Sequence, residues 1–178
     1  SELTKADLSA WRPLLEIWFT THPNSGVHSA AGYALRSWQL EEPTIVVRDT
    51  PAATHDWLRT QSGLTLIRIP AGRFTREQIY NPFARKQSVS FHRDLWLCDR
   101  EVSAGLFREF VADDKYARDF PNEAIRGWEG QGAMISPTPA HPVQNVNWYD
   151  AVKFCNWLSR RERRKVCYRW KDAAEGAE

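Results

Sequence analysis

The chain has 178 residues, enough for one ordinary domain or for a small domain with an appendage. A net charge of +2 is too small to indicate a general binder of polyanions, whereas nine Trp, eight Phe and five Tyr supply enough apolar surface for a core. No apolar run approaches the roughly 20 residues that a membrane helix needs, and the N-terminus lacks the pattern of a signal peptide.

The cysteine count bears on the cellular compartment. Three cysteines cannot all pair with one another, so the count fits either a reducing compartment or a pairing partner elsewhere. Since the chain also lacks a long apolar run, we expect no membrane segment and favour a cytoplasmic location. The chain starts at Ser1 rather than at Met, which fits processing or excision from a longer protein.

Residues 1–40 are predicted to form a helical hairpin. Asp7 or Ser9 can cap the first helix, and Pro13 is tolerated in a first turn. Residues 22–26 have the composition of a turn. The predicted apolar positions of the two helices are Trp11, Leu14, Leu15, Trp18 and Phe19, then Val27, Ala30, Ala31, Ala34, Leu35 and Trp38. Similar αα-hairpins occur in helical repeats, but the chain contains no second copy.

The next segment, residues 41–63, is predicted to be a linker with some order. Thr44 to Val47 is a candidate short strand, bracketed by Pro43 and Pro51. A second region starts at about residue 64. It contains predicted strands at 64–69, 88–92 and 94–98, a helix capped by Ser103 and ending near Ala112, and a long loop over 113–140.

The stretch from His141 to Ser159 is the most informative one. Val143 and Val146 favour a short strand that leads into a helix over residues 148–160. Asn147 is a good N-cap, and Asp150 lies where its carboxylate can reach back to the cap. One stripe of this helix is predicted to be buried: Trp148, Ala151, Val152, Cys155 and Leu158. Basic residues gather at the C-terminal end of this helix, where the helix dipole favours positive charge. The polar tail from Lys171 to Glu178 is expected to fray.

The same stretch resembles a family. A Pro–Val pair, a Val, an Asn–Trp–x–Asp–Ala run and an aromatic–Cys–x–Trp helix are typical of the formylglycine-generating enzyme, or sulfatase-modifying factor, domain; Trp157 is the Trp of that last element. Three further matches follow the family's order: residues 66–74, residues 95–103 and the helix with Leu106 and Phe110. Together they cover about residues 64–168, and we assign residues 64–178 to this domain.

The resemblance implies a C-type-lectin-like fold, so the expected class is α+β, with a helical hairpin followed by part of that domain.

The chain also departs from the family pattern. Phe74 is followed by Thr75-Arg76-Glu77, where the family usually has x–Met–Gly. The later Arg–Leu–Pro–Thr–Glu, Gly–Asn–Val and Arg–Gly–Gly–Ser–Trp elements are absent. The family's copper-binding cysteine pair and calcium sites belong to that later part, so the chain resembles the front portion of such a domain.

None of the cysteines or histidines forms a recognisable catalytic or metal pattern. Cys98 and Cys155 are expected to be buried and Cys167 to be exposed, and no pair is expected unless the chain folds back after the helix. In secreted family members the cysteine at the position of Cys155 can form a disulfide with the distal part of the domain. There is no C-x-x-C and no zinc spacing, and the iron motif H-x-x-x-H-x-E of related oxygenases is missing. We expect no cofactor and no metal.

Two surfaces are candidates for binding. The basic run from Arg160 to Lys165, with nearby aromatics, could contact phosphate and bases, but a solvated helix end is the favoured interpretation, so nucleic acid is not an expected partner. The glycine-rich loop around Arg126 and Trp128 suits a binding loop, although a spacer fits as well.

Two functions remain open. The first is a non-catalytic recognition or scaffold module of a larger bacterial protein, whose partner is another protein or the remainder of the parent chain. The second is the front fragment of a copper-dependent formylglycine-generating oxidase that acts on a protein cysteine. Because the family's catalytic part is absent, we favour the first. The residues singled out on the 148–160 helix, Asn147, Trp148, Asp150, Cys155 and Trp157, are then structural.

Overall fold

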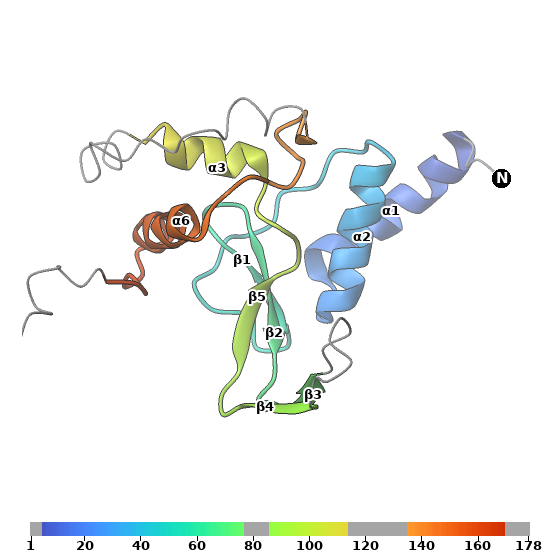
Figure 1. The fold of residues 1–178 in the computed structure, drawn as a ribbon. Coiled ribbons are helices and arrows are strands. Elements are labelled where there is room, and N and C mark those ends of the chain that lie inside the picture. Colours follow the sequence, from blue (N-terminus) through green and yellow to red (C-terminus); the bar gives the residue numbers. More distant parts are fainter. Residues whose placement is uncertain (1–4, 77–85, 114–134, 170–178) are drawn as a thin grey trace, which may run out of the picture. The chain divides into compact units, whose positions relative to one another are not determined.

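The computed structural model describes residues 5–76, 86–113 and 135–169. The chain divides into two compact units, residues 1–99 and residues 100–178. The described elements are α1 (Lys5–Thr21), α2 (Ser25–Ser37), β1 (Trp57–Arg59), β2 (Thr65–Ile69), β3 (Gly72–Arg76), β4 (Gln87–Phe91), β5 (Leu95–Cys98), α3 (Ala104–Val111) and α6 (Trp148–Arg161) (Figure 1). Helices and small antiparallel sheets make an α+β protein, as predicted. None of the helices described is long and apolar enough to cross a membrane.

The predicted hairpin is present as α1 and α2, which pack side by side in the first unit (Figure 1). Its buried core consists of Leu15, Phe19, Ala31 and Leu35. Packing is close, because a Cβ added at Gly32 would lie 2.7 Å from Cε2 of Phe19. The expected place of Pro13 was wrong. Helix α1 starts at Lys5, so Pro13 lies inside it, where the missing N–H removes one helical hydrogen bond.

Helix α2 is specified at both ends. Asn24 caps its start, accepting a hydrogen bond of 3.1 Å from the Val27 amide. At its end Gln39 takes a left-handed conformation with φ 56°, and the amide of Leu40 donates to the carbonyl of Leu35 over 2.9 Å. This Schellman motif turns the chain so that Leu40 packs back on the hairpin core.

The main sheet of the first unit has the order β1-β2-β5, and both pairings are antiparallel. Strands β2 and β5 confirm two of the predicted strands, and β4 confirms the third. Strand β3, which the sequence did not predict, pairs with β4 in a separate two-stranded ribbon, where Phe74 stacks on Phe91. Strand β1 lies within the segment predicted as a linker.

The predicted strand from Thr44 to Val47 was wrong. The segment carries no strand, and the nearest ladder-like contact is the amide of Arg48, which donates to the carbonyl of Arg59 over 3.1 Å. The two prolines that bracket the segment suit an extended connection that does not join a sheet.

The second unit is built on α3 and α6. Ser103 caps α3 through the Leu106 amide over 3.2 Å, as predicted. The core between the two helices is aromatic, with ring centroids 5.2 to 5.6 Å apart: Phe107, Phe110, Phe154 and Trp157. The predicted strand with Val143 and Val146 is only an isolated bridge between Ser103 and Pro142.

Helix α6 confirms the predicted helix but buries a different face. Trp148, expected inside, is 64% exposed, and Ala151 is exposed as well. The buried residues are Asp150, Val152, Lys153, Phe154, Asn156 and Trp157. Phe154 and Trp157 are far larger than Ala151 and Cys155, so the helix turns these two rings onto α3, and Cys155 is left half-buried at the margin.

Candidate functional site

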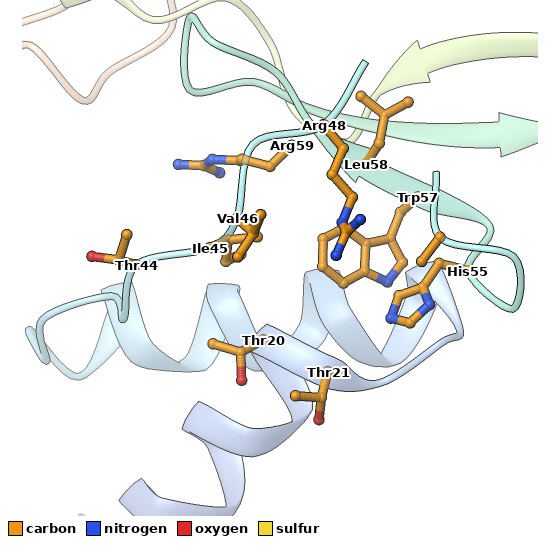
Figure 2. A pocket seen from close by; sticks show the side chains of 11 residues that line it. Thr20, Thr21, Thr44, Ile45, Val46, Arg48, His55, Trp57, Leu58 and Arg59 are labelled. Atoms are coloured by element: carbon orange, nitrogen blue, oxygen red, sulfur yellow. The ribbon is translucent and has the colours of Figure 1, made fainter. Parts of the chain in front are cut away.

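A pocket of about 360 Å³ opens in the first unit, between the hairpin and the segment that leads to β1 (Figure 2). Helix α1 contributes Thr20 and Thr21 at its last turn. The remaining lining residues come from the connecting segment and β1: Thr44, Ile45, Val46, Arg48, Ala52, His55, Trp57, Leu58 and Arg59. Most of this segment was predicted to be a linker, so the pocket was not predicted from the sequence.

The connecting segment is fixed by charge pairs at its start. Glu42 pairs with Arg36 on α2 and lies 3.8 Å from the guanidinium of Arg59 on β1. Ile45 packs against the hairpin core. These contacts hold the segment against both the hairpin and the sheet, so one wall of the pocket has a defined position.

Trp57 forms the rigid wall. It is 4% exposed, and its indole N–H donates to the carbonyl of His22 over 2.8 Å. Its ring stacks on His28 at 3.8 Å and meets His55 edge-on at 5.3 Å. An aromatic ring held from three directions gives this side of the pocket a fixed position.

His28 packs against the ring of Trp57 and helps to fix its position. It is fully buried, lies between the rings of Phe19 and Trp57, and its Nδ1 is 2.6 Å from the carbonyl of Phe19. A carbonyl only accepts, so Nδ1 carries the hydrogen, and Nε2 is left to accept from the hydroxyl of Thr65 at 3.3 Å. No metal or catalytic pattern was found among the histidines, and this structural role of His28 was not predicted. Its place among the small residues of α2 was the available signal.

Arg48 supplies the pocket's charge. The residue is exposed and extends toward Trp57 (Figure 2), and its side chain forms no hydrogen bond or ion pair with any residue described. His55 also lines the pocket, and its Nδ1 hydrogen-bonds with the hydroxyl of Thr54 over 3.1 Å. The pocket therefore combines an apolar wall with an available guanidinium, an arrangement suited to an anionic group next to an apolar one.

The residues predicted on α6 have structural contacts in the second unit. Asn147 accepts from the Asp150 amide over 2.9 Å, which confirms the cap. Burial raises the pKa of the Asp150 carboxyl, and a bond from the Asn147 backbone opposes this rise. Burial lowers the pKa of Lys153. Trp157 donates its indole N–H to Asp113 over 2.8 Å, and Arg161 lies 5.0 Å from the centre of its ring.

The cysteines differ from expectation. Cys98 and Cys155 are half-buried rather than buried, and Cys167 is exposed as predicted. The chain does fold back after α6. Asn156 donates to the carbonyl of Tyr168 over 2.9 Å and accepts from its amide over 3.1 Å. Burial raises the pKa of Cys155, and the charge of Cys167 raises it further.

The remaining predicted site residues cannot be placed. Arg126 and Trp128, the candidate binding loop, lie outside the described residues. Within the ranges described, no three His, Cys, Asp or Glu side chains gather as a metal site would require.

Comparison with known proteins supplies one match. The model of the Sulfatase-modifying factor enzyme 1-like domain matches residues 54–177. No curated protein and no solved structure matches the chain significantly. Strand β1 and the Trp57 wall of the pocket thus fall inside the matched region, as does the whole of α6. The match covers well over half of the sequence, and the chain belongs to the family of sulfatase-modifying factor enzyme 1-like domains.

Proposed function

We propose that this chain is a non-catalytic recognition module of a larger bacterial protein, and that it binds a protein partner through the pocket of the first unit. The observation that carries the proposal is Arg48, which lines the pocket, extends toward the fixed ring of Trp57 (Figure 2) and has no partner for its guanidinium among the described residues. Family membership alone does not favour binding over catalysis.

The pocket's size and lining specify what it takes. At about 360 Å³ it lies at the low end of the roughly 300–1,000 Å³ typical of ligand sites, which suits one or two side chains of an extended peptide. Ile45 and Val46 offer apolar contact, and Arg48 can bind a carboxylate through two parallel N–H bonds. The ligand we infer is a peptide segment with an acidic residue next to an apolar one.

A peptide library displayed on phage and selected on the chain tests this proposal. We expect the enriched peptides to combine Asp or Glu with a neighbouring apolar residue. Arg48→Glu should then weaken the binding of a selected peptide by tenfold or more, since charge-assisted hydrogen bonds contribute roughly 1.5–3 kcal/mol. Arg93→Glu is the matched control, because Arg93 is an exposed arginine of the same unit that does not line the pocket.

The outcomes are distinct. If the enriched peptides bind wild type and both variants with equal affinity, the pocket is not their binding site. If the Arg93 variant also loses binding, the effect of Arg48→Glu is due to net charge and not to the pocket. Selection that yields no acidic–apolar motif would contradict the proposed ligand class.

One observation favours the second function, the front fragment of a copper-dependent formylglycine-generating oxidase that acts on a protein cysteine. Two hydrogen bonds between Asn156 and Tyr168 bring together the segments that carry Cys155 and Cys167, and thiolates are the ligands that copper(I) prefers. These two cysteines would offer a soft metal two sulfur ligands. The resemblance places the family's copper-binding pair in a later part of the domain, so these two positions do not correspond to it. Sequencing the parent gene beyond residue 178 discriminates, because a downstream Arg–Gly–Gly–Ser–Trp element with a cysteine pair favours the oxidase.

A further inference from the structure

The C-terminal end of α6 reverses the chain by a defined turn. Arg163 is left-handed with φ 55°. Its amide donates to the carbonyl of Arg160 over 3.0 Å, and the amide of Arg164 donates to the carbonyl of Ser159 over 2.7 Å. These two bonds make a Schellman motif. The residues that follow are thereby directed back toward the helix they have just left.

A buried asparagine holds the returning chain in register. Asn156 is 9% exposed and uses both atoms of its amide, donating to the Tyr168 carbonyl and accepting from the Tyr168 amide. A pair of bonds of 2.9 and 3.1 Å to the same residue fixes its position and its direction. The residues that precede these two in sequence are Cys155 and Cys167, so these bonds bring together the two segments that carry the cysteines.

The two thiols have different environments. Cys155 is half-buried on α6, whereas Cys167 is exposed on the returning segment. Burial raises the pKa of Cys155, and the charge of Cys167 raises it further. Exposed cations surround Cys167 in sequence, with Arg163 and Lys165 before it and Arg169 after it.

We propose that Cys155 and Cys167 are a redox-active dithiol, which a small anionic disulfide such as oxidised glutathione converts into an intramolecular disulfide. The exposed sulfur of Cys167 is the entry point, and the cations around it attract an anionic reagent. The product would tie the returning segment covalently to α6, at the place where Asn156 already holds it.

The exchange has two steps that balance. The Cys167 thiolate attacks one sulfur of the glutathione disulfide, and one glutathione leaves and takes up the proton that Cys167 lost. The Cys155 thiolate then attacks the Cys167 sulfur of the mixed disulfide, and the second glutathione leaves with the proton of Cys155. Two protein thiols are oxidised to one disulfide, and one small disulfide is reduced to two thiols.

Mass spectrometry of the whole 178-residue chain tests the proposal. The reduced chain is incubated with oxidised glutathione at about 1 mM, the order of effective concentration that a short connection gives two groups. Free thiols are then blocked and counted. We expect wild type to lose two thiols and retain no glutathione. Trypsin cleaves after the basic residues between Cys155 and Cys167, so the disulfide should join two otherwise separate peptides.

Single variants separate the steps. Cys155→Ser should stop at the mixed disulfide, with one glutathione on Cys167. Cys167→Ser should react at Cys155 at least about tenfold more slowly than wild type, because Cys155 is half-buried and its thiol ionises less readily. Cys98→Ser is the matched control, since Cys98 is half-buried in the other unit, and it should behave as wild type does.

Three results would overturn the proposal. The first is a wild-type chain that keeps all three thiols while an exposed model thiol is oxidised. The second is a chain that ends with glutathione on both Cys155 and Cys167, because closure has then failed. The third is a disulfide that includes Cys98 or joins two chains, seen as a dimer on a non-reducing gel. Each is read independently of peptide binding to the pocket.

Discussion

The imidazole of His28 stacks on the indole of Trp57 with ring centroids 3.8 Å apart and planes inclined by 15°. His28 belongs to the hairpin and Trp57 to the first strand of the region matched by the family domain. The hairpin and the sheet of the first unit therefore share one core. The pocket next to Trp57 depends on that shared core for its shape.

We expect His28→Ala to destabilise the first unit by about 3 kcal/mol, because it removes a fully buried ring and leaves the Phe19 carbonyl without its partner. Urea unfolding followed by tryptophan fluorescence measures the loss. His92→Ala is the control, since His92 is exposed in the same unit and should change stability by less than about 0.5 kcal/mol. Equal effects of the two variants would mean that the stack adds no stability.

The end of α6 allows a stabilising change. Arg163 holds a left-handed conformation that costs a non-glycine residue roughly 1–2 kcal/mol, so Arg163→Gly should stabilise the second unit by about 1 kcal/mol. Thermal unfolding measures the gain. Gln39→Gly should act in the same way at the end of α2, whereas Arg164→Gly, at a residue without positive φ, should give no gain. A destabilised Arg163 variant would show that its side chain has contacts worth more than the strain.

The burial of Asp150 makes the free energy of unfolding depend on pH, and the direction of this dependence follows from its pKa. Its folded-state pKa is raised, mainly by burial, so the folded chain holds this proton more tightly than the unfolded chain does. The carboxyl therefore reduces stability as pH rises from its ordinary value near 4 through the raised folded pKa, and no further above that. Asp150→Asn should become more stable relative to wild type across this window.

Urea unfolding of wild type and Asp150→Asn from pH 3.5 to pH 7.5 measures the difference. A relative loss of stability in the variant with rising pH would show that the carboxylate's place in the first turn of α6 outweighs its burial. Asp94→Asn serves as the opposite control. The pKa of Asp94 is lowered by bonds from the Ala71 amide and Arg68, so its variant should lose stability relative to wild type as pH rises.

Strand β5 carries a surface that favours association. It is one edge of the three-stranded sheet in the part of the chain described, and Leu95, Trp96 and Leu97 are 38%, 38% and 60% exposed. Open edges with apolar side chains pair with other chains. We expect light scattering to show self-association at high concentration, and Leu97→Lys to reduce it. Arg93→Lys, which keeps charge and exposure, should not. A monomer at all concentrations would contradict this.

Local rules predicted much of this fold. The caps at Ser103 and Asn147 and the hairpin turn follow from side chains within a few residues of each other, and the structure has them. The buried face of α6 was not predictable from its own period. The sequence of α6 contains two overlapping apolar stripes. The contacts with Phe107 and Phe110 on α3 determine which stripe is buried.

The pocket and the cysteine pair were missed for a related reason. Trp57 is a wall only because His28 and His22 hold it from positions about thirty residues earlier in the chain. The segment with Cys167 returns to α6 through the turn at Arg163 and the bonds between Asn156 and Tyr168, which no sequence period indicates. Contacts made by single polar side chains at long range leave little trace in composition or spacing.

The chain alone is expected not to oxidise a peptide cysteine to formylglycine. That chemistry needs a thiolate pair for copper(I) and a groove that fixes the substrate cysteine beside the metal. Asn156 and Tyr168, which follow Cys155 and Cys167 in sequence, are hydrogen-bonded, but Cys155 is half-buried with a raised pKa, and the pocket described above lies in the other unit. The assay incubates the reduced chain with copper(I) and a peptide that contains Cys–x–Pro–x–Arg, and mass spectrometry follows the cysteine. We expect no conversion to the aldehyde. Turnover that vanishes in both Cys155→Ser and Cys167→Ser, and persists in Cys98→Ser, would place the oxidase first and make this pair its metal site.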